Sequence, residues 1–126
     1  MKEFMFFIRK RANSKETLSA EQHQQFLKGC ELYIGKLKKE GKLISAQPIE
    51  WSGDIISSAG KGWNSAPYDE TGEVIGGYYH IRVQDLKEAI SIAKENPEFQ
   101  FNPGTRIEVR PIKMKEESTG FVYPKG

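Results

Sequence analysis

The chain has 126 residues, and its 19 Lys and Arg residues nearly balance its 17 Asp and Glu residues, leaving a formal charge of +2. This length suits one domain with its own core and leaves no room for a second full domain. The near-neutral charge disfavours nucleic acid as the main partner, because phosphate binding requires a concentrated surplus of Lys and Arg. With 37% hydrophobic and 29% charged residues, the composition indicates a soluble globular protein and specifies no chemistry.

The longest apolar run, residues 4–8, is far shorter than the ~20 residues of a membrane helix, so we expect no membrane association. The first residues lack the apolar stretch of a secretory signal, and we expect a cytoplasmic protein. The single cysteine, Cys30, cannot form an internal disulfide. It falls among apolar helix positions and is predicted to fill the core rather than to act as a nucleophile.

The first predicted strand, residues 4–8, has no polar alternate, which is typical of a central strand covered on both faces. Ser19 and Gln22 form a capping box, which predicts a helix over residues 20–40 that ends at Gly41. Its apolar side chains recur at helical spacing and are expected to face the core. They are Phe26, Leu27, Cys30, Tyr33, Ile34 and Leu37.

Residues 43–49 are predicted to form a second strand, and residues 55–58 to pair with the stretch around Trp63 as a short hairpin. A long strand over residues 74–83 contains Gly76-Gly77, a pair that favours a bulge or a close approach of backbones.

Asp85 is expected to cap a second helix that Asn96-Pro97 ends. Its inward residues are predicted to be Leu86, Ala89, Ile90 and Ala93. The last strand, residues 106–112, contains Pro111, which indicates a sheet edge because proline cannot donate to a strand ladder.

The elements follow the βαββαβ order of the ferredoxin-like fold, an α+β class with an antiparallel sheet, here with an inserted short hairpin. We expect a domain over residues 1–112 and a C-terminal tail over residues 113–126. Both helices cover one face of the sheet in this fold, which leaves the opposite face bare. Met5 and Phe7 are expected on the bare face, which predicts a homodimer packed sheet to sheet.

Several sequence blocks occur in a fixed order: GKLI at 41–44 before Pro48, PY at 67–68 before EVIGGYY at 73–79, DLKEAI at 85–90, and IEVRPI at 107–112. Together they resemble the YCII-related family, and within it most closely the DGPF-domain branch. The resemblance covers residues 4–112. It implies a ferredoxin-like dimeric α+β barrel, in agreement with the strand order.

The chain departs from that family at two places. Ser65-Ala66-Pro67-Tyr68 stands where the branch carries Asp-Gly-Pro-Phe, so no role of that aspartate is assigned here. Cys30 and Lys39 stand where small family members carry a His and an Asp on the first helix, a suggested catalytic pair that is absent from this chain. Members of the branch often accompany extracytoplasmic sigma factors, which suggests a regulatory context.

Polar side chains are predicted to gather on the bare, dimer-facing side of the sheet. Strand alternation places there Tyr78, His80, Arg82, Glu108 and Arg110. It places on the helix side Ile75, Tyr79, Ile81, Val83, Ile107 and Val109. His80 would act as acid or base, Glu108 would orient it, and Arg82 or Arg110 would hold an anionic group.

Three interpretations of these side chains stay open: an ion-pair network at the dimer interface, a small-molecule site, or a catalytic site. Tyr78, Tyr68 and Trp63 are further candidate ligand-binding residues. With Trp51, the last two either line a pocket mouth or pack against the hairpin and core.

We therefore expect a dimeric binding or regulatory module with a cleft for a small anionic or aromatic ligand. Neither cofactor nor metal is expected, because two histidines and one cysteine lack metal-ligand spacing. The alternative is a cofactor-independent isomerase, lyase or oxygenase that uses His80, since dimeric α+β barrels host such chemistries. A third reading is interaction with a regulator through residues 113–126. The sequence leaves open whether the protein is an enzyme.

Overall fold

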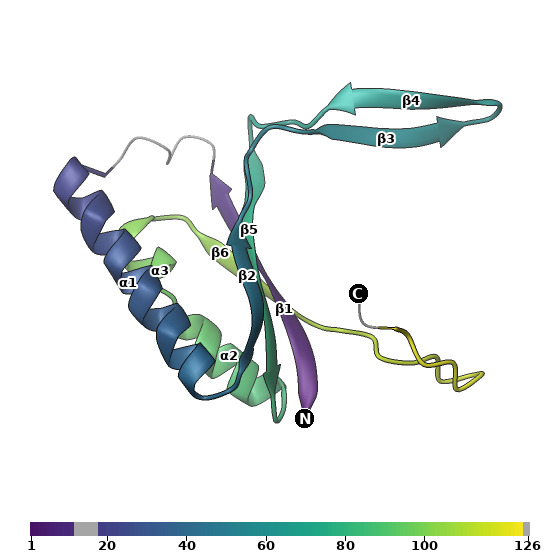
Figure 1. Cartoon of the computed structure of the whole chain (residues 1–126). Helices are drawn as coiled ribbons and strands as arrows, with labels where there is room; N and C mark the ends of the chain where they lie inside the picture. Colours follow the sequence, from purple (N-terminus) through teal and green to yellow (C-terminus); the bar gives the residue numbers. More distant parts are fainter. Residues whose placement is uncertain (12–17, 125–126) are drawn as a thin grey trace.

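The computed structural model describes residues 1–11 and 18–124. Its elements in chain order are β1 (Lys2–Arg11), α1 (Ala20–Lys39), β2 (Leu43–Pro48), β3 (Asp54–Ala59), β4 (Gly62–Pro67), β5 (Glu73–Val83), α2 (Leu86–Lys94), α3 (Glu98–Phe101) and β6 (Arg106–Pro111). The helices cover one face of a sheet, and the β3–β4 hairpin and the C-terminal tail extend from the other side (Figure 1). This is the expected α+β, ferredoxin-like arrangement.

The main sheet is antiparallel and has the order β2-β5-β1-β6. β1 is central, as its uninterrupted apolar run predicts. Phe4, Phe6 and Ile8 point to the helices and are at most 2% exposed, whereas Met5 and Phe7 are half-buried on the opposite face. β6, which ends at Pro111, lies at an edge, where a missing N–H donor costs no ladder bond.

Helix α1 begins and ends where its sequence signals predict. The Ser19 side chain accepts a hydrogen bond from the Gln22 backbone, and the Gln22 side chain accepts one from the Ser19 backbone. Gly41 follows the helix with a φ of 70°, a conformation that glycine adopts without strain. The buried Tyr33 hydroxyl donates to the carbonyl of Ile92 at 2.7 Å and so ties α1 to α2. No helix in the described residues is long and apolar enough to cross a membrane.

The inward faces of both long helices differ in part from the predicted ones. In α2, Ile92 is buried with the alanines before and after it, while Leu86 and Ile90 are 46% and 38% exposed. The cap at Asp85, which accepts from the Glu88 backbone at 2.9 Å, fixes where the helix begins, and the buried positions 89, 92 and 93 share one face at helical spacing. In α1, Leu27 is 52% exposed, because it lies at the margin of the stripe.

A β-bulge in β5 explains a further difference. Ile8 pairs with Gly77 and the next residue of β1 pairs with Ile75, so that Gly76 is the extra residue. One extra residue reverses the alternation of side chains beyond it. Val74, rather than the predicted Ile75, is therefore fully buried. The predicted bulge is confirmed. The prediction that Ile75 faces the helices is wrong, because it assumed simple alternation through the bulge.

Candidate functional site

His80 lies on the bare face of the sheet, but Glu108 does not orient it. Its Nε2 atom lies 2.7 Å from Oε1 of Glu3, whose side chain is only 4% exposed. β1 lies between the strands that carry His80 and Glu108, and Glu3 is on β1 itself. Alternation from Met5 and Phe7 back along β1 is the signal that identifies Glu3.

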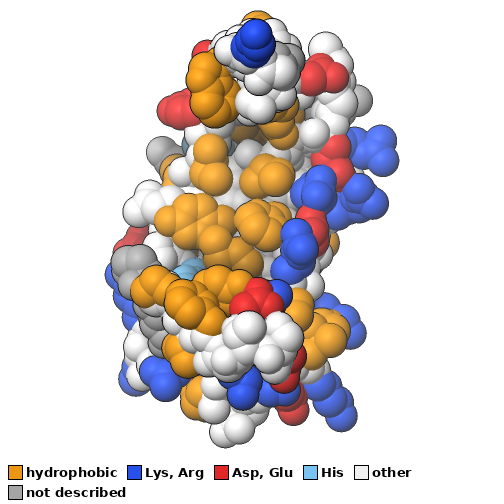
Figure 2. Space-filling view, turned by 90° about the vertical axis from the view of Figure 1, so that its right-hand side faces the viewer, with side chains coloured by type: hydrophobic (Ala, Val, Ile, Leu, Met, Phe, Trp, Pro, Cys, Tyr) orange, Lys and Arg blue, Asp and Glu red, His pale blue; other side chains and the backbone are white. Residues whose placement is uncertain are grey.

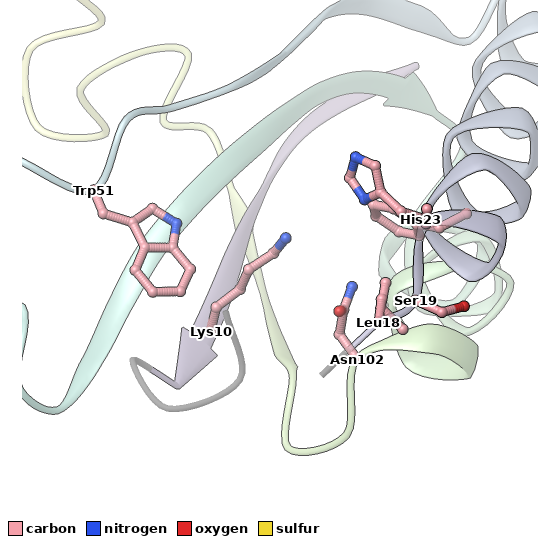
Figure 3. A pocket seen from close by; sticks show the side chains of 8 residues that line it. Lys10, Leu18, Ser19, His23, Trp51 and Asn102 are labelled. Carbon is pink, nitrogen blue, oxygen red and sulfur yellow. The ribbon is translucent and has the colours of Figure 1, made fainter. Parts of the chain in front are cut away.

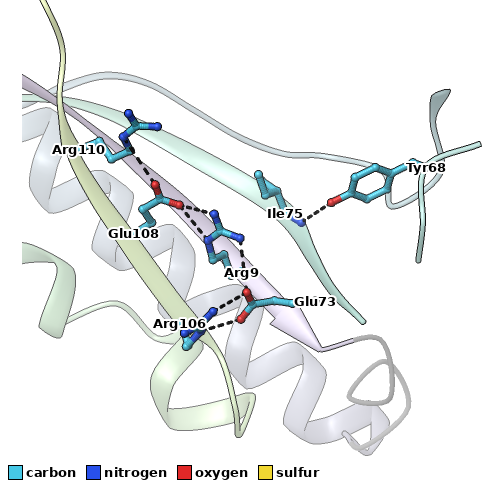
Figure 4. Close-up of polar contacts among 7 residues, drawn as sticks. All are labelled: Arg9, Tyr68, Glu73, Ile75, Arg106, Glu108 and Arg110. Carbon is cyan, nitrogen blue, oxygen red and sulfur yellow. Dashed lines mark hydrogen bonds and ion pairs between the residues drawn. The ribbon is translucent and has the colours of Figure 1, made fainter. Parts of the chain in front are cut away.

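Glu108 instead belongs to a row of ion pairs that crosses β6, β1 and β5 (Figure 4). Its carboxylate accepts from Arg9 at 2.9 and 2.5 Å, and Arg9 lies 3.4 Å from Glu73. Arg106 donates two hydrogen bonds of 2.7 Å to Glu73, which lower the pKa of the Glu73 carboxyl. Because these groups are partly exposed, each pair adds little stability. Within one chain, the row is a network of ion pairs that links three strands of the sheet.

The remaining predicted residues of the bare face occupy separate positions. The Tyr78 hydroxyl lies 3.2 Å from Oγ of Ser45, on the β2 side of the sheet. Arg82 is exposed near the end of β5, whereas Arg110 lies on β6, with Nε 3.6 Å from Glu108. Within one chain, these side chains form no single anion-binding cluster around His80.

Tyr68 and Trp63 occupy different parts of the hairpin region. The Tyr68 hydroxyl accepts a hydrogen bond from the Ile75 backbone at 3.4 Å, at the base of the hairpin (Figure 4). Trp63 is 82% exposed on the hairpin, which extends away from the sheet (Figure 1). Trp51 lines a cavity.

The more enclosed site lies on the helix-covered face of the sheet. A cavity of about 230 Å³ is bounded by side chains of β1, α1, β2 and β5. Its apolar wall includes Ile8, Phe26, Cys30, Ile34, Ala46 and Tyr79. Two charged residues, Lys10 and Glu98, also line it, as does part of Tyr78, one of the predicted ligand-binding residues. A mostly apolar cavity with a few fixed polar groups is the usual form of a small-molecule site.

Lys10 is the centre of this region. It also lines two further cavities, of about 470 and 300 Å³, that reach Trp51, and we call the three together the Lys10 cleft. Its Nζ atom lies 3.0 Å from Oε2 of Glu98 and 5.6 Å from the centre of the Phe26 ring. Figure 3 shows the ammonium pointing into the space between Trp51 and His23.

The glycines of the bulge shape one wall of the cleft. A Cβ atom at Gly77 would lie 3.2 Å from the backbone oxygen of Gln47, and one at Gly76 would lie 3.1 Å from Nε1 of Trp51. Both distances are shorter than ordinary van der Waals contact. Glycine at these positions therefore allows β2 and Trp51 to approach the backbone of β5.

The ionisable groups of the apolar wall are neutral at physiological pH. Burial, with a smaller contribution from the nearby Glu98 carboxylate, raises the pKa of the Cys30 thiol to about 11, and the Lys10 ammonium opposes this shift only in part. Burial likewise raises the pKa of Tyr79. A protonated thiol is a poor nucleophile, so Cys30 lines the cleft without being activated there. It is half-buried rather than part of a closed core.

The sequence predictions did not include Lys10 or Glu98. The signal for Lys10 was present, because alternation from Phe6 and Ile8 places residue 10 on the helix side, where a lone ammonium requires a partner. Glu98 was harder to find, since it lies on the short helix α3, which the sequence did not predict. Its position beside Lys10 is a consequence of tertiary packing.

Among residues 1–11 and 18–124, no three His, Cys, Asp or Glu side chains are grouped as metal ligands. The sequence profile of the family described as the YCII-related domain matches residues 3–113. No functionally curated protein matches the chain. The match covers most of the chain and supplies no reaction, so the chemistry of the site rests on its geometry.

Proposed function

The chain belongs to the YCII-related family, and from the geometry of the Lys10 cleft we propose that it is a small-molecule-binding protein. The ligand class is a compact aromatic molecule with one anionic group. The observation that carries this proposal is an apolar cavity of about 230 Å³ with a lysine ammonium at its margin. This volume lies just below the usual range for drug-sized ligands, roughly 300–1,000 Å³, which favours a one- or two-ring molecule.

The hydrogen bonds inside the cleft favour an acceptor on the ligand. Both carboxylate oxygens of Glu98 already have partners, since Oε1 accepts from Asn102 at 2.6 Å and Oε2 pairs with Lys10. An ammonium has three N–H donors, and Glu98 accepts one of them. The remaining donors of Lys10 suit a carboxylate or enolate. Phe26 and Trp51 offer ring faces at the same place.

The functional unit in this proposal is a cytoplasmic homodimer. The bare face of the sheet supports this assembly, because Met5 and Phe7 lie there only half-buried within one chain and exposed apolar patches of this kind mark interfaces. The Lys10 cleft lies on the other face, so each copy keeps its own binding site. A regulatory role, in which ligand occupancy controls a partner protein, fits this arrangement. We also propose that, within the YCII-related family, the chain is most closely related to the DGPF-domain branch.

The binding proposal is tested with matched pairs of ligands. Benzoate, indole carboxylates and naphthoates are compared with their neutral amides by thermal shift and by alkylation of Cys30 with iodoacetamide. At 100 times its dissociation constant a ligand stabilises the folded state by roughly 2.7 kcal/mol. We expect the best carboxylate to raise Tm, to slow alkylation of Cys30, and to bind more tightly than its amide. The proposal is contradicted if no compound in the set raises Tm and none slows the alkylation of Cys30.

Variants separate the Lys10 cleft from the bare face. Lys10→Met is expected to weaken carboxylate binding by about 10- to 100-fold, the value of a hydrogen bond to a charged group, and to spare the amide. Lys36→Met, at an exposed lysine of α1, is the matched control. Lys10→Met leaves Glu98 without its partner, which can unfold the protein. In that case the double variant Lys10→Met/Glu98→Gln, which removes both charges, is used in place of the single variant.

The alternative is a cofactor-independent enzyme that uses His80 as acid or base. The observation that favours it is the 2.7 Å contact of His80 with the buried Glu3, since a buried carboxylate can fix the orientation of an imidazole. His80→Ala then abolishes the thermal shift caused by a ligand of the bare face. If every ligand found still shifts Tm in His80→Ala as in the wild type, this alternative fails and the Lys10 cleft stands.

A further inference from the structure

Two segments extend from the bare face of the sheet. The β3–β4 hairpin extends at one end of this face, and the described part of the C-terminal tail, residues 113–124, extends at the other (Figure 1). Between them lies an apolar floor, with a band of Lys, Arg, Asp and Glu along one side (Figure 2). The bare face is therefore a trough, bounded at both ends by projecting chain.

The projecting segments carry large apolar side chains in contact with water. On the hairpin, Ile55, Ile56 and Trp63 are 55%, 60% and 82% exposed. In the tail, Phe121 and Val122 are also more than half exposed. A two-stranded hairpin without cover is marginally stable in water. The hairpin therefore requires a surface to pack against, and the sheet of its own chain does not supply one (Figure 1).

The strand pairing places apolar groups on both faces of the hairpin. Ile56 pairs with Ser65, and Ser58 pairs with Trp63, so Ile56 and Trp63 share one face, while Ile55 lies on the other. A hairpin that lay flat on a single surface would need only one apolar face. This pattern suits a hairpin inserted between two layers.

The exposed area of the chain points to the same conclusion. The chain exposes 9122 Å², whereas a compact monomer of 14.3 kDa is expected to expose ~6,800 Å². The excess is about 2,300 Å², and a stable homodimer needs roughly 1,000 Å² or more from each partner. The chain as a whole thus exposes enough area beyond that of a compact monomer for an extensive interface.

We propose that the β3–β4 hairpin is a dimerisation arm that extends past the sheet of a second copy of this chain. Two sheets packed face to face lie ~10 Å apart, and a six-residue strand spans ~20 Å. An arm of this length crosses the gap between the sheets and continues to the level of the partner's helices. In a two-fold dimer each chain gives one arm and receives one, so the partner chain supplies each hairpin with the cover that its own sheet does not.

This inference rests on the homodimer proposed above, and the experiment separates the two. The mass of the full chain is measured by light scattering during gel filtration, and the dissociation constant by sedimentation equilibrium. We expect a dimer, and a double variant Ile56→Ser/Trp63→Ser that dimerises about 30-fold more weakly or worse. Leu32→Ser, at a residue of α1 that is 66% exposed, is the matched control and is expected to leave dimerisation unchanged. Far-UV circular dichroism checks that each variant is folded.

Fluorescence provides a second measurement that does not depend on altering the arm. In Trp51→Phe, whose dimer mass is checked first, Trp63 is the remaining tryptophan. We expect its emission to be blue-shifted and protected from acrylamide in the dimer, and to move to the red on dilution. A monomeric wild type overturns both the dimer and the arm. A dimer that the arm variants leave intact, or in which Trp63 emits as in water, overturns the arm alone.

Discussion

The two faces of the sheet are built by alternate residues of the same strands, yet they differ in what one chain can complete. On the helix face of β1, Phe4, Phe6 and Ile8 are almost fully buried. On the other face Met5 and Phe7 remain half-buried beside a row of ion pairs. The helix face thus combines a finished core with a ligand-sized cleft, whereas the bare face has the composition of an interface. The second face of β1 can therefore be fully buried only by contact with another molecule.

The largest expected effect compares adjacent phenylalanines. Phe6→Ala removes a fully buried ring and should lower the free energy of unfolding by about 3–5 kcal/mol. Phe7→Ala should cost less in the monomer, and its cost should grow with protein concentration, because a ring at a dimer interface contributes through association. Thermal unfolding at several protein concentrations measures both. Equal, concentration-independent losses would remove the distinction between the two faces.

A smaller effect compares two glycines. Gly77→Ala should destabilise the protein by about 1–3 kcal/mol, because its Cβ meets backbone atoms of β2 that cannot move independently. Gly35→Ala should stabilise it by roughly 0.5–1 kcal/mol, since this position is in the interior of α1 with nothing within 4 Å of the new Cβ. Urea unfolding measures both values. A neutral Gly77→Ala would show that β2 packs loosely at the cleft.

The smallest effect tests the ion pairs of the bare face. Arg106 lowers the pKa of the Glu73 carboxyl, so the stability this pair adds is present at neutral pH and is lost as pH falls through the lowered pKa. Glu73→Gln should therefore differ slightly from wild type at neutral pH and match it once the pH has fallen below that lowered pKa. Urea unfolding from neutral to acid pH detects this, with Glu31→Gln on α1 as the control. A difference that persists in acid would assign the effect to packing rather than charge.

Most of the fold follows from local sequence signals. The capping box at Ser19, the two-sided apolar run of β1 and the proline of β6 each identify their element, because each acts within a few residues. The candidate site follows less well. Alternation correctly places His80 on the bare face. Its partner is Glu3 rather than Glu108, because β1 is the strand that lies beside β5. The Lys10–Glu98 pair joins residues far apart in sequence, and the bulge changes the facing of residues that ordinary alternation would assign otherwise.

The bulge at Gly76 also makes this part of β5 tolerant of a change in chain length. Deletion of this one residue would leave Ile75 paired with Arg9 and Val74 paired with Lys10, the pairs that they already form. Val74 would then stay in the core, and the Glu73 carboxylate would still face Arg9 and Arg106. A loss of three nucleotides at this codon would thus preserve the ion-pair row and alter only the wall of the Lys10 cleft beside Trp51, where Gly76 lies.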